Sequence, residues 1–327
     1  MSTTTGRRTG DERVGTGNGD APETPAKLPK RSWLGVLRRT IREFKNDNLT
    51  DWAAALTYYG ILSIFPALLA VVSVLGLVGQ SATQPLIQNL GSVAPGPAKQ
   101  ILTSTLQNLQ KSQGAAGILV IVGLAGALWS ASGYVAAFMR ASNAIYDVGE
   151  GRPIWKTLPV RVGVTIVTVA LLAISAVAVV VTGPLAKQVG NVVGLGSVAV
   201  TAWDIAKWPV LVLVVSFMFA LLYWAAPNVK HPKFRWVSPG GVLAVLLWIV
   251  ASAAFAFYVA NFSSYNKTYG SIGGVICFLT WLWISNVAVL LGAEFNAELE
   301  RGRQIEAGHP EDREPFLEPR DTRKLKT

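Results

Sequence analysis

The sequence has very few of the side chains that build disulfides and metal sites. Its 327 residues include one cysteine, Cys277, and two histidines, His231 and His309. A lone cysteine cannot form a disulfide within the chain, and this set cannot supply the thiolates and imidazoles of the usual zinc sites. We therefore expect no disulfide framework, no metal and no other cofactor.

Recognisable catalytic patterns are also missing. The chain has no HExxH motif, no Walker loop, no Ser/His/Asp set and no group of carboxylates at metal-binding spacing. An ATP-driven pump is not expected on this ground. The sequence predicts that the protein is not an enzyme.

Charge is scarce, whereas apolar residues are abundant. Charged residues make up 15% of the chain and hydrophobic residues 51%, and the mean hydropathy is +0.40. This composition is typical of a polytopic membrane protein. A helix needs about 20 apolar residues to cross a bilayer. Six uncharged apolar segments approach or exceed that length: residues 53–79, 115–139, 162–182, 209–226, 240–260 and 272–292. We expect an all-α fold, a bundle of six transmembrane helices.

The basic residues are segregated between alternate extramembrane pieces. Of the 29 lysines and arginines, 24 fall in the pieces that share a side with the two termini, and 5 fall in the others. By the positive-inside rule, both termini face the cytoplasm. The same segregation explains the net charge of +10, so we expect no nucleic-acid partner.

Three regions follow from these patterns. Residues 1–32 and 302–327 are polar and are predicted to form disordered cytoplasmic tails. Residues 33–301 form the transmembrane domain, which begins with an amphipathic helix over 33–45. That helix alternates apolar residues with arginines, and is typical of a segment lying on the bilayer surface. Its partner is the lipid bilayer, either through an anionic lipid or as a plain juxtamembrane anchor.

Polar residues inside the spans and at their cytoplasmic ends are candidates for a polar cavity or pathway. They are Asp51, Thr57, Tyr58, Tyr59, Ser63, Arg140, Asn143, Asn286 and Glu294. An amide in hydrocarbon needs a hydrogen-bond partner, and hydroxyls of the first or second span are the obvious partners for Asn286. Such groups either join helices or line a pathway, and the sequence leaves both interpretations open.

Glu294 follows the last span closely. We expect it to be partly buried and paired with Arg140 or Arg161, in which case Glu294→Gln destabilises the protein more than Glu298→Gln does. The alternative is a solvated carboxylate worth little to stability. Small residues such as Gly240 and Gly292 let helices approach closely, within one chain or in a homo-oligomer.

Several ordered motifs resemble the YihY/BrkB family of bacterial inner-membrane proteins, once labelled ribonuclease BN. They are DWAAALTYY (51–59), LSIFP (62–66), NAIYDV (143–148), RP (152–153), PNV (227–229), WVSPG (236–240), YGS (269–271) and GAEFNAEL (292–299). The resemblance implies a six-span protein of the bacterial plasma membrane with both ends in the cytoplasm. Family members have carried ribonuclease and virulence-factor labels, and some have been connected with envelope lipid export or transport.

The sequence thus favours a multi-pass membrane protein that transports a solute or translocates a lipid, with the substrate unidentified. A membrane-tethered ribonuclease is the first alternative, although phosphodiester hydrolysis would require a metal-holding cluster or an acid/base pair that the chain does not offer. A structural or interaction protein of the envelope is the second alternative.

Overall fold

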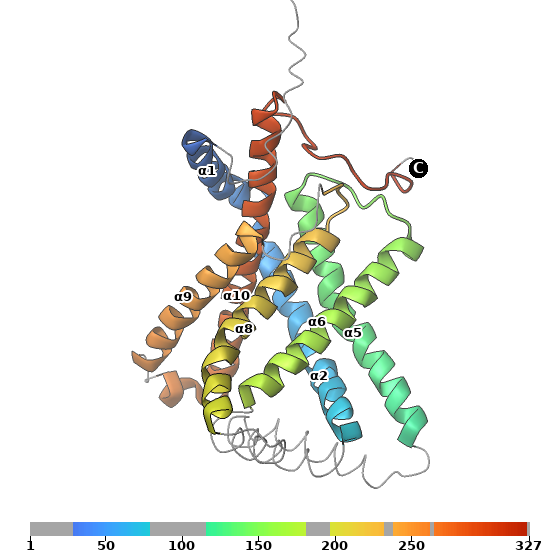
Figure 1. Ribbon diagram of the computed structural model, residues 1–327, viewed down its shortest axis with the longest axis vertical. Helices are drawn as coiled ribbons and strands as arrows, with labels where there is room; N and C mark the ends of the chain where they lie inside the picture. Colours follow the sequence, from blue (N-terminus) through green and yellow to red (C-terminus); the bar gives the residue numbers. More distant parts are fainter. Residues whose placement is uncertain (1–28, 79–115, 181–196, 232–237, 262–264, 326–327) are drawn as a thin grey trace, which may run out of the picture.

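The structure is a computed structural model that describes residues 29–78, 116–180, 197–231, 238–261 and 265–325 (Figure 1). These residues form seven helices and no strand, which confirms the all-α class. The helices are α1 (Lys30–Asn46), α2 (Leu49–Val78), α5 (Ala116–Ile145), α6 (Ile154–Val180), α8 (Ser197–Ala225), α9 (Pro239–Asn261) and α10 (Tyr265–Glu306).

Four helices contain a described stretch that is long and apolar enough to cross a membrane. The stretches are Ile154–Ser175 in α6, Val198–Ala225 in α8, Pro239–Val259 in α9 and Gly273–Glu306 in α10. They overlap the last four spans expected from the sequence. The first two expected spans coincide with α2 and α5, each 30 residues long, whose side chains are described only in part.

The buried core lies where α2, α5 and α10 pack against one another. Leu56 of α2, Phe138 of α5 and Leu290 of α10 are fully buried there. Large apolar side chains such as Ile174 and Phe257 instead point outward from α6 and α9. A helix bundle in a bilayer requires an apolar outer surface, because the acyl chains of the surrounding lipids are as apolar as the protein core.

Helices α9 and α10 touch backbone to backbone at two glycines. A Cβ atom built on Gly240 would lie 2.0 Å from the carbonyl oxygen of Gly292, and one built on Gly292 would lie 2.4 Å from that of Gly240. Neither position can hold a larger side chain without moving a helix. The close approach expected from small residues therefore occurs within a single chain.

Helix α1 lies across the upper end of α10 (Figure 1) and includes the residues 33–45 for which a helix was expected. Its inward face is formed by Val36 and Thr40, both buried, and Trp33 packs against Phe295 of α10 with ring centroids 6.2 Å apart. Leu37, one turn after Trp33, is 50% exposed. The helix thus packs on α10 along one face and leaves apolar residues on another.

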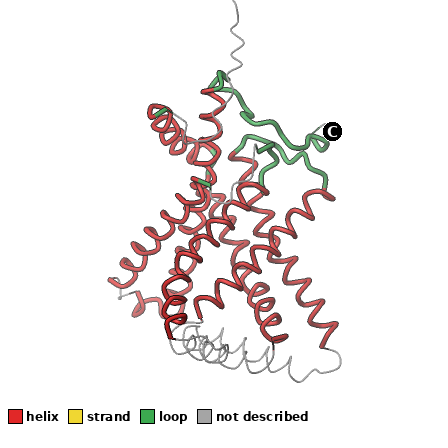
Figure 2. Tube along the Cα trace, viewed as in Figure 1, coloured by secondary structure: helices red, strands yellow, loops and turns green. Residues whose placement is uncertain are grey.

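The C-terminal segment (residues 307–325) departs from the expected disordered tail over 302–327. Helix α10 runs on to Glu306, and the C-terminal segment then crosses the end of the bundle where the described loops gather (Figure 2). Phe316 and Leu317 are buried in the core cluster, and Pro319 forms an antiparallel bridge with Val229. The polar composition hid these two apolar anchors, because two residues are too few to mark a packed segment.

Candidate functional site

The amide of Asn286 joins three helices inside the bundle. Its Nδ2 donates to Thr57 Oγ1 of α2 at 3.0 Å, and its Oδ1 accepts from the Tyr134 hydroxyl of α5 at 2.8 Å. Asn286 is 3% exposed. Neither lipid nor the apolar core offers hydrogen-bond partners to its amide, so these two contacts satisfy it. The partners are hydroxyls of the first two spans, as the sequence predicts, but Tyr134 was not among the candidate residues.

Tyr58, Tyr59, Ser63 and Arg140 lie beside this junction on the α2–α5 surface. Tyr58 is 61% exposed and meets the Tyr59 ring edge-on at 5.4 Å. The Arg140 guanidinium lies over the Tyr59 ring, 5.5 Å from its centroid, and the Ser63 hydroxyl donates to the Tyr59 carbonyl at 2.6 Å. Tyr58 therefore faces outward, whereas the ring of Tyr59 is covered by the Arg140 guanidinium.

A second arginine reaches the same surface from α6. Arg161 Nε donates to Ser132 Oγ at 2.7 Å, and the guanidinium lies 5.1 Å from the ring centroid of Trp129. Arg161 lies just before the span expected over 162–182, and its partner Ser132 lies within the span expected over 115–139, so the charge stands near the ends of these spans. In the described part of the chain, no carboxylate forms an ion pair with Arg140 or Arg161, and the expected pairing with Glu294 is wrong.

Glu294 is instead surrounded mainly by other carboxyl groups. It is 1% exposed, and its Oε2 has no hydrogen-bond partner. Asp47, in the turn between α1 and α2, lies close enough to interact electrostatically with the Glu294 side chain. The burial of Glu294 was predicted correctly, but the arginine expected to pair with it, Arg140 or Arg161, lies elsewhere. Across the described residues, no three His, Cys, Asp or Glu side chains are arranged to hold a metal ion.

Glu298, one turn further along α10, forms ion pairs with two arginines. Its Oε2 accepts from Arg39 Nε of α1 at 2.6 Å, and its Oε1 lies 3.3 Å from Arg301 Nε. Arg301 also reaches Asp147, at 3.2 Å. This chain of ion pairs ties α1 and the end of α5 to α10. Asp51 is not part of it: the residue is exposed in the first turn of α2, where a negative charge suits the helix dipole.

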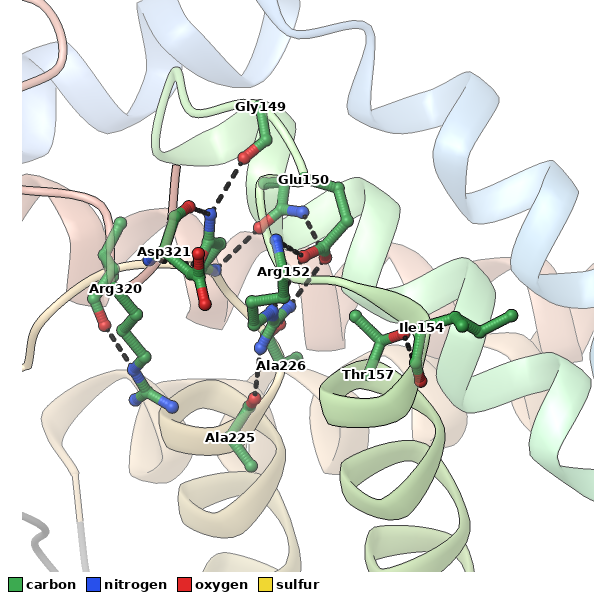
Figure 3. Close-up of polar contacts among 12 residues, drawn as sticks. Gly149, Glu150, Arg152, Ile154, Thr157, Ala225, Ala226, Arg320 and Asp321 are labelled. Atoms are coloured by element: carbon green, nitrogen blue, oxygen red, sulfur yellow. Dashed lines mark hydrogen bonds and ion pairs between the residues drawn. The ribbon is translucent and has the colours of Figure 1, made fainter. Parts of the chain in front are cut away.

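Asn143, the remaining candidate, belongs to a separate polar cluster. Figure 3 shows Glu150, Arg152 and Asp321 of this cluster. Its Oδ1 accepts from the Asn228 backbone N–H at 2.7 Å, and its Nδ2 donates to Glu150 Oε2 at 3.0 Å. The Asn228 amide donates in turn to the carbonyls of Gly149 and Asp321. Three chain segments far apart in sequence are fastened here.

Arg152 completes this cluster. Its guanidinium contacts both Glu150 oxygens, at 2.8 and 2.7 Å, and donates to the Ala226 carbonyl at 2.7 Å. Burial alone would raise the pKa of Glu150, but the Arg152 guanidinium and the Asn143 amide hold it below the ordinary value. The Arg-Pro and Pro-Asn-Val motifs meet at this point, so we assign Asn143 to loop fastening.

Sequence reasoning found the polar residues but not their partners. Asp47, Glu150 and Asp321 were not singled out, because each lies in a polar stretch where carboxylates are ordinary. Only the fold shows that Asp47 faces Glu294 and that the backbone of Asp321 reaches Asn228. The motifs at 143–148, 152–153 and 227–229 were the available signals for the loop cluster.

Helices of this length and hydropathy, with apolar outer surfaces and buried polar junctions, define a multi-pass membrane protein. The sequence model described as Virulence factor BrkB matches residues 40–315. The chain belongs to this family, as its motifs indicated.

Curated relatives agree with this assignment. Ribonuclease-like protein YfkH of Bacillus subtilis (strain 168) is 32% identical over 79% of this chain and 92% of its own length. Membrane proteins named UPF0761 from Alkalilimnicola ehrlichii and Chromohalobacter salexigens are 31% and 28% identical, over 78% and 86% of this chain. The chain spans 56% and 68% of their lengths. No solved structure matches the chain.

These relatives place the protein among the multi-pass proteins of the bacterial inner membrane. Neither the family description nor the UPF0761 names state a catalytic activity. The word ribonuclease belongs to the name of one relative and identifies no residue of this chain.

Proposed function

We propose that the protein translocates an amphipathic, lipid-class substrate along the α2–α5–α6 surface. The observation that carries this proposal is the pair of arginines on that surface, Arg140 and Arg161, neither of which has an ion-paired carboxylate in the described structure. Exposed Tyr58 and Trp129 lie beside them, at 61% and 59% exposure. Polar and charged groups thus face outward on helices that are otherwise apolar.

Arg140 and Arg161 stand at the ends of apolar spans, where an arginine costs less than the about 2.5–3.5 kcal/mol that insertion scales give for the centre of a helix. Ionisable residues on membrane helices generally mark a path for ions or substrate. A headgroup moving along this surface would meet guanidinium and hydroxyl donors while its acyl chains stayed in the bilayer. A soluble solute would require an enclosed cavity, so the outward-facing arrangement favours a lipid.

The proposal includes six spans with both termini in the cytoplasm. The charge segregation in the sequence supports this topology. So does the arrangement of the described residues, because α1, the loops at 146–153 and 226–231, and the C-terminal segment lie at one end of the bundle (Figure 2). Helix α1 would then lie on the cytoplasmic leaflet, where exposed Arg38 and Arg42 are available to anionic headgroups.

A flux measurement tests the translocation. The full chain is reconstituted into liposomes that contain a fluorescent phospholipid, and loss of fluorescence to an impermeant quencher reports transfer between leaflets. We expect the protein to accelerate transfer, and Arg140→Gln and Arg161→Gln each to slow it several-fold. The control is Arg313→Gln, an exposed arginine of the C-terminal segment. Transfer no faster than in protein-free liposomes would refute the proposal.

A further inference from the structure

The junction of α1, α2, α5 and α10 contains more carboxyl groups than cations. Glu294 is 1% exposed, as is Glu298, and its Oε2 has no hydrogen-bond partner. Asp47 approaches from the α1–α2 turn, and the carboxyl groups of Asp47 and Glu294 act on each other electrostatically. Two ionised carboxylates repel each other strongly when they are buried. The pair is therefore more stable when one of its members holds a proton.

The charged groups around the pair come from every element that packs there. The α1 end supplies Glu43, the α5 end supplies Asp147 and buried Tyr146, α10 supplies Glu298 and Arg301, and the C-terminal segment supplies Glu314 toward Asp147. Arg301 is already engaged with Glu298 and Asp147, Arg42 is paired with Glu43, and Arg320 faces Tyr146. Arg39 is engaged with Glu298. No cation contacts Glu294 directly among the described residues.

A buried carboxylate without a cation lowers its free energy by taking up a proton. We propose that Asp47 and Glu294 form a proton-binding site that shares one proton between the two carboxyl groups. The proton comes from cytoplasmic water and is released to it again, since Asp47 lies in the turn outside the spans and is only partly buried. The acid excess favours the protonated state.

The position of Asp47 sets the range over which the site titrates. Burial, together with the nearby charges of Asp147 and Glu43, raises the pKa of Asp47 to about 7. Asn48, at φ 52°, turns the chain there from α1 into α2, a conformation that asparagine tolerates. The backbone thus presents Asp47 to α10, and the Asp47 carboxyl group exchanges a proton near the pH of the cytoplasm.

The use of this proton rests on the proposed function. The site joins α10, whose Asn286 contacts α2 and α5, to the turn that leads into α2. Loss of the proton would place a second negative charge between α2 and α10, and the repulsion would separate them. Protonation would then control the helices that form the translocation surface.

The binding step is tested on the full chain in detergent, without any lipid flux. Infrared spectroscopy follows the carbonyl band of protonated carboxyl groups, and an indicator dye counts protons released, as the pH rises from about 5 to about 9. We expect wild type to release about one proton per chain more than Glu294→Gln, and to lose a carbonyl band that the variant lacks. Glu318→Gln, which alters an exposed pair with Lys230, should match wild type.

Stability supplies a second measurement. A carboxyl group whose pKa is raised by folding contributes stability below its unfolded pKa of about 4, and that stability is lost as the pH rises through the folded value. The Tm of wild type should therefore fall as the pH passes about 7, and that of Glu294→Gln should fall less. If Glu294→Gln does not fold, Asp47→Asn replaces it with the same expectations.

Identical proton release and identical dependence of Tm on pH in wild type and these variants would refute the proposed proton-binding site. A normal titration in a protein without lipid flux would leave the proton site standing and would remove the proposed function instead. Flux that continues in Glu294→Gln with an unchanged pH profile would overturn the coupling.

Discussion

Neutralising Glu298 should destabilise the protein more than neutralising Glu294. The sequence alone suggested the reverse order, because Glu294 is closer to the apolar span. In the structure Glu298 accepts from Arg39 at 2.6 Å and lies 3.3 Å from Arg301, and the arginines are only 11% and 6% exposed. Glu298→Gln keeps the side-chain shape but leaves both guanidiniums without their shared counter-charge.

The expected loss follows from the burial of these groups. Removing one partner of a buried ion pair costs about 3–5 kcal/mol. Arg301 keeps Asp147 as a second partner, so the lower end applies, about 3 kcal/mol. With about 2–4 °C per kcal/mol for a large domain, the Tm should fall by about 6–12 °C. Glu294 has no direct cation to lose, and its neutral amide replacement should cost less.

Thermal unfolding of the purified variants in one detergent measures the difference. Glu318→Gln is the matched control, because its pair with Lys230 is 72% and 61% exposed and such pairs contribute about 0–1 kcal/mol. A double-mutant cycle with Arg39→Gln should show that the two losses are not additive. The ion-pair reasoning is wrong if Glu298→Gln has the same Tm as Glu318→Gln. It is also wrong if the stability losses of Arg39→Gln and Glu298→Gln are additive in the double variant.

Two further predictions concern the loop cluster and the helix contact. Asn228→Ala removes hydrogen bonds to the backbone of Asp321 and of Gly149 and should cost about 3 kcal/mol, so trypsin should cut the C-terminal segment faster than in wild type or in the exposed-site control Asn46→Ala. Equal cutting rates would contradict the fastening. Gly292→Leu should abolish folded, monodisperse protein, because even a Cβ would lie 2.4 Å from the Gly240 oxygen, whereas Gly163→Leu, at an open position, should elute like wild type. Matching elution profiles would contradict the backbone contact.

The helices themselves were accessible from sequence. Hydropathy is a local property of consecutive residues, and a run of about 20 apolar residues has few stable alternatives to a membrane helix. The last four expected spans therefore overlap α6, α8, α9 and α10. The amphipathic spacing of residues 33–45 likewise predicted α1. The close contact at Gly240 was signalled by small residues at helical spacing.

The partners of the polar residues were not accessible in the same way. Arg39 and Glu298 are 259 positions apart, and Asn228 and Asp321 are 93 apart. A charge in one segment is equally compatible with several distant partners, and Arg140 or Arg161 was as reasonable a guess for Glu294 as any. The C-terminal segment was missed for the same reason, since its burial depends on a surface that the rest of the chain builds.

The sequence by itself determined the all-α class, the membrane setting and the family, because these depend on composition, local periodicity and short motifs. The tertiary structure alone decided which acids have cations. It gives Glu298 two arginines and Glu294 a second carboxyl group, although both glutamates lie on one helix a turn apart. The physical reason is that ion pairing and burial depend on what neighbouring helices bring to a point in space, and chain order does not encode that.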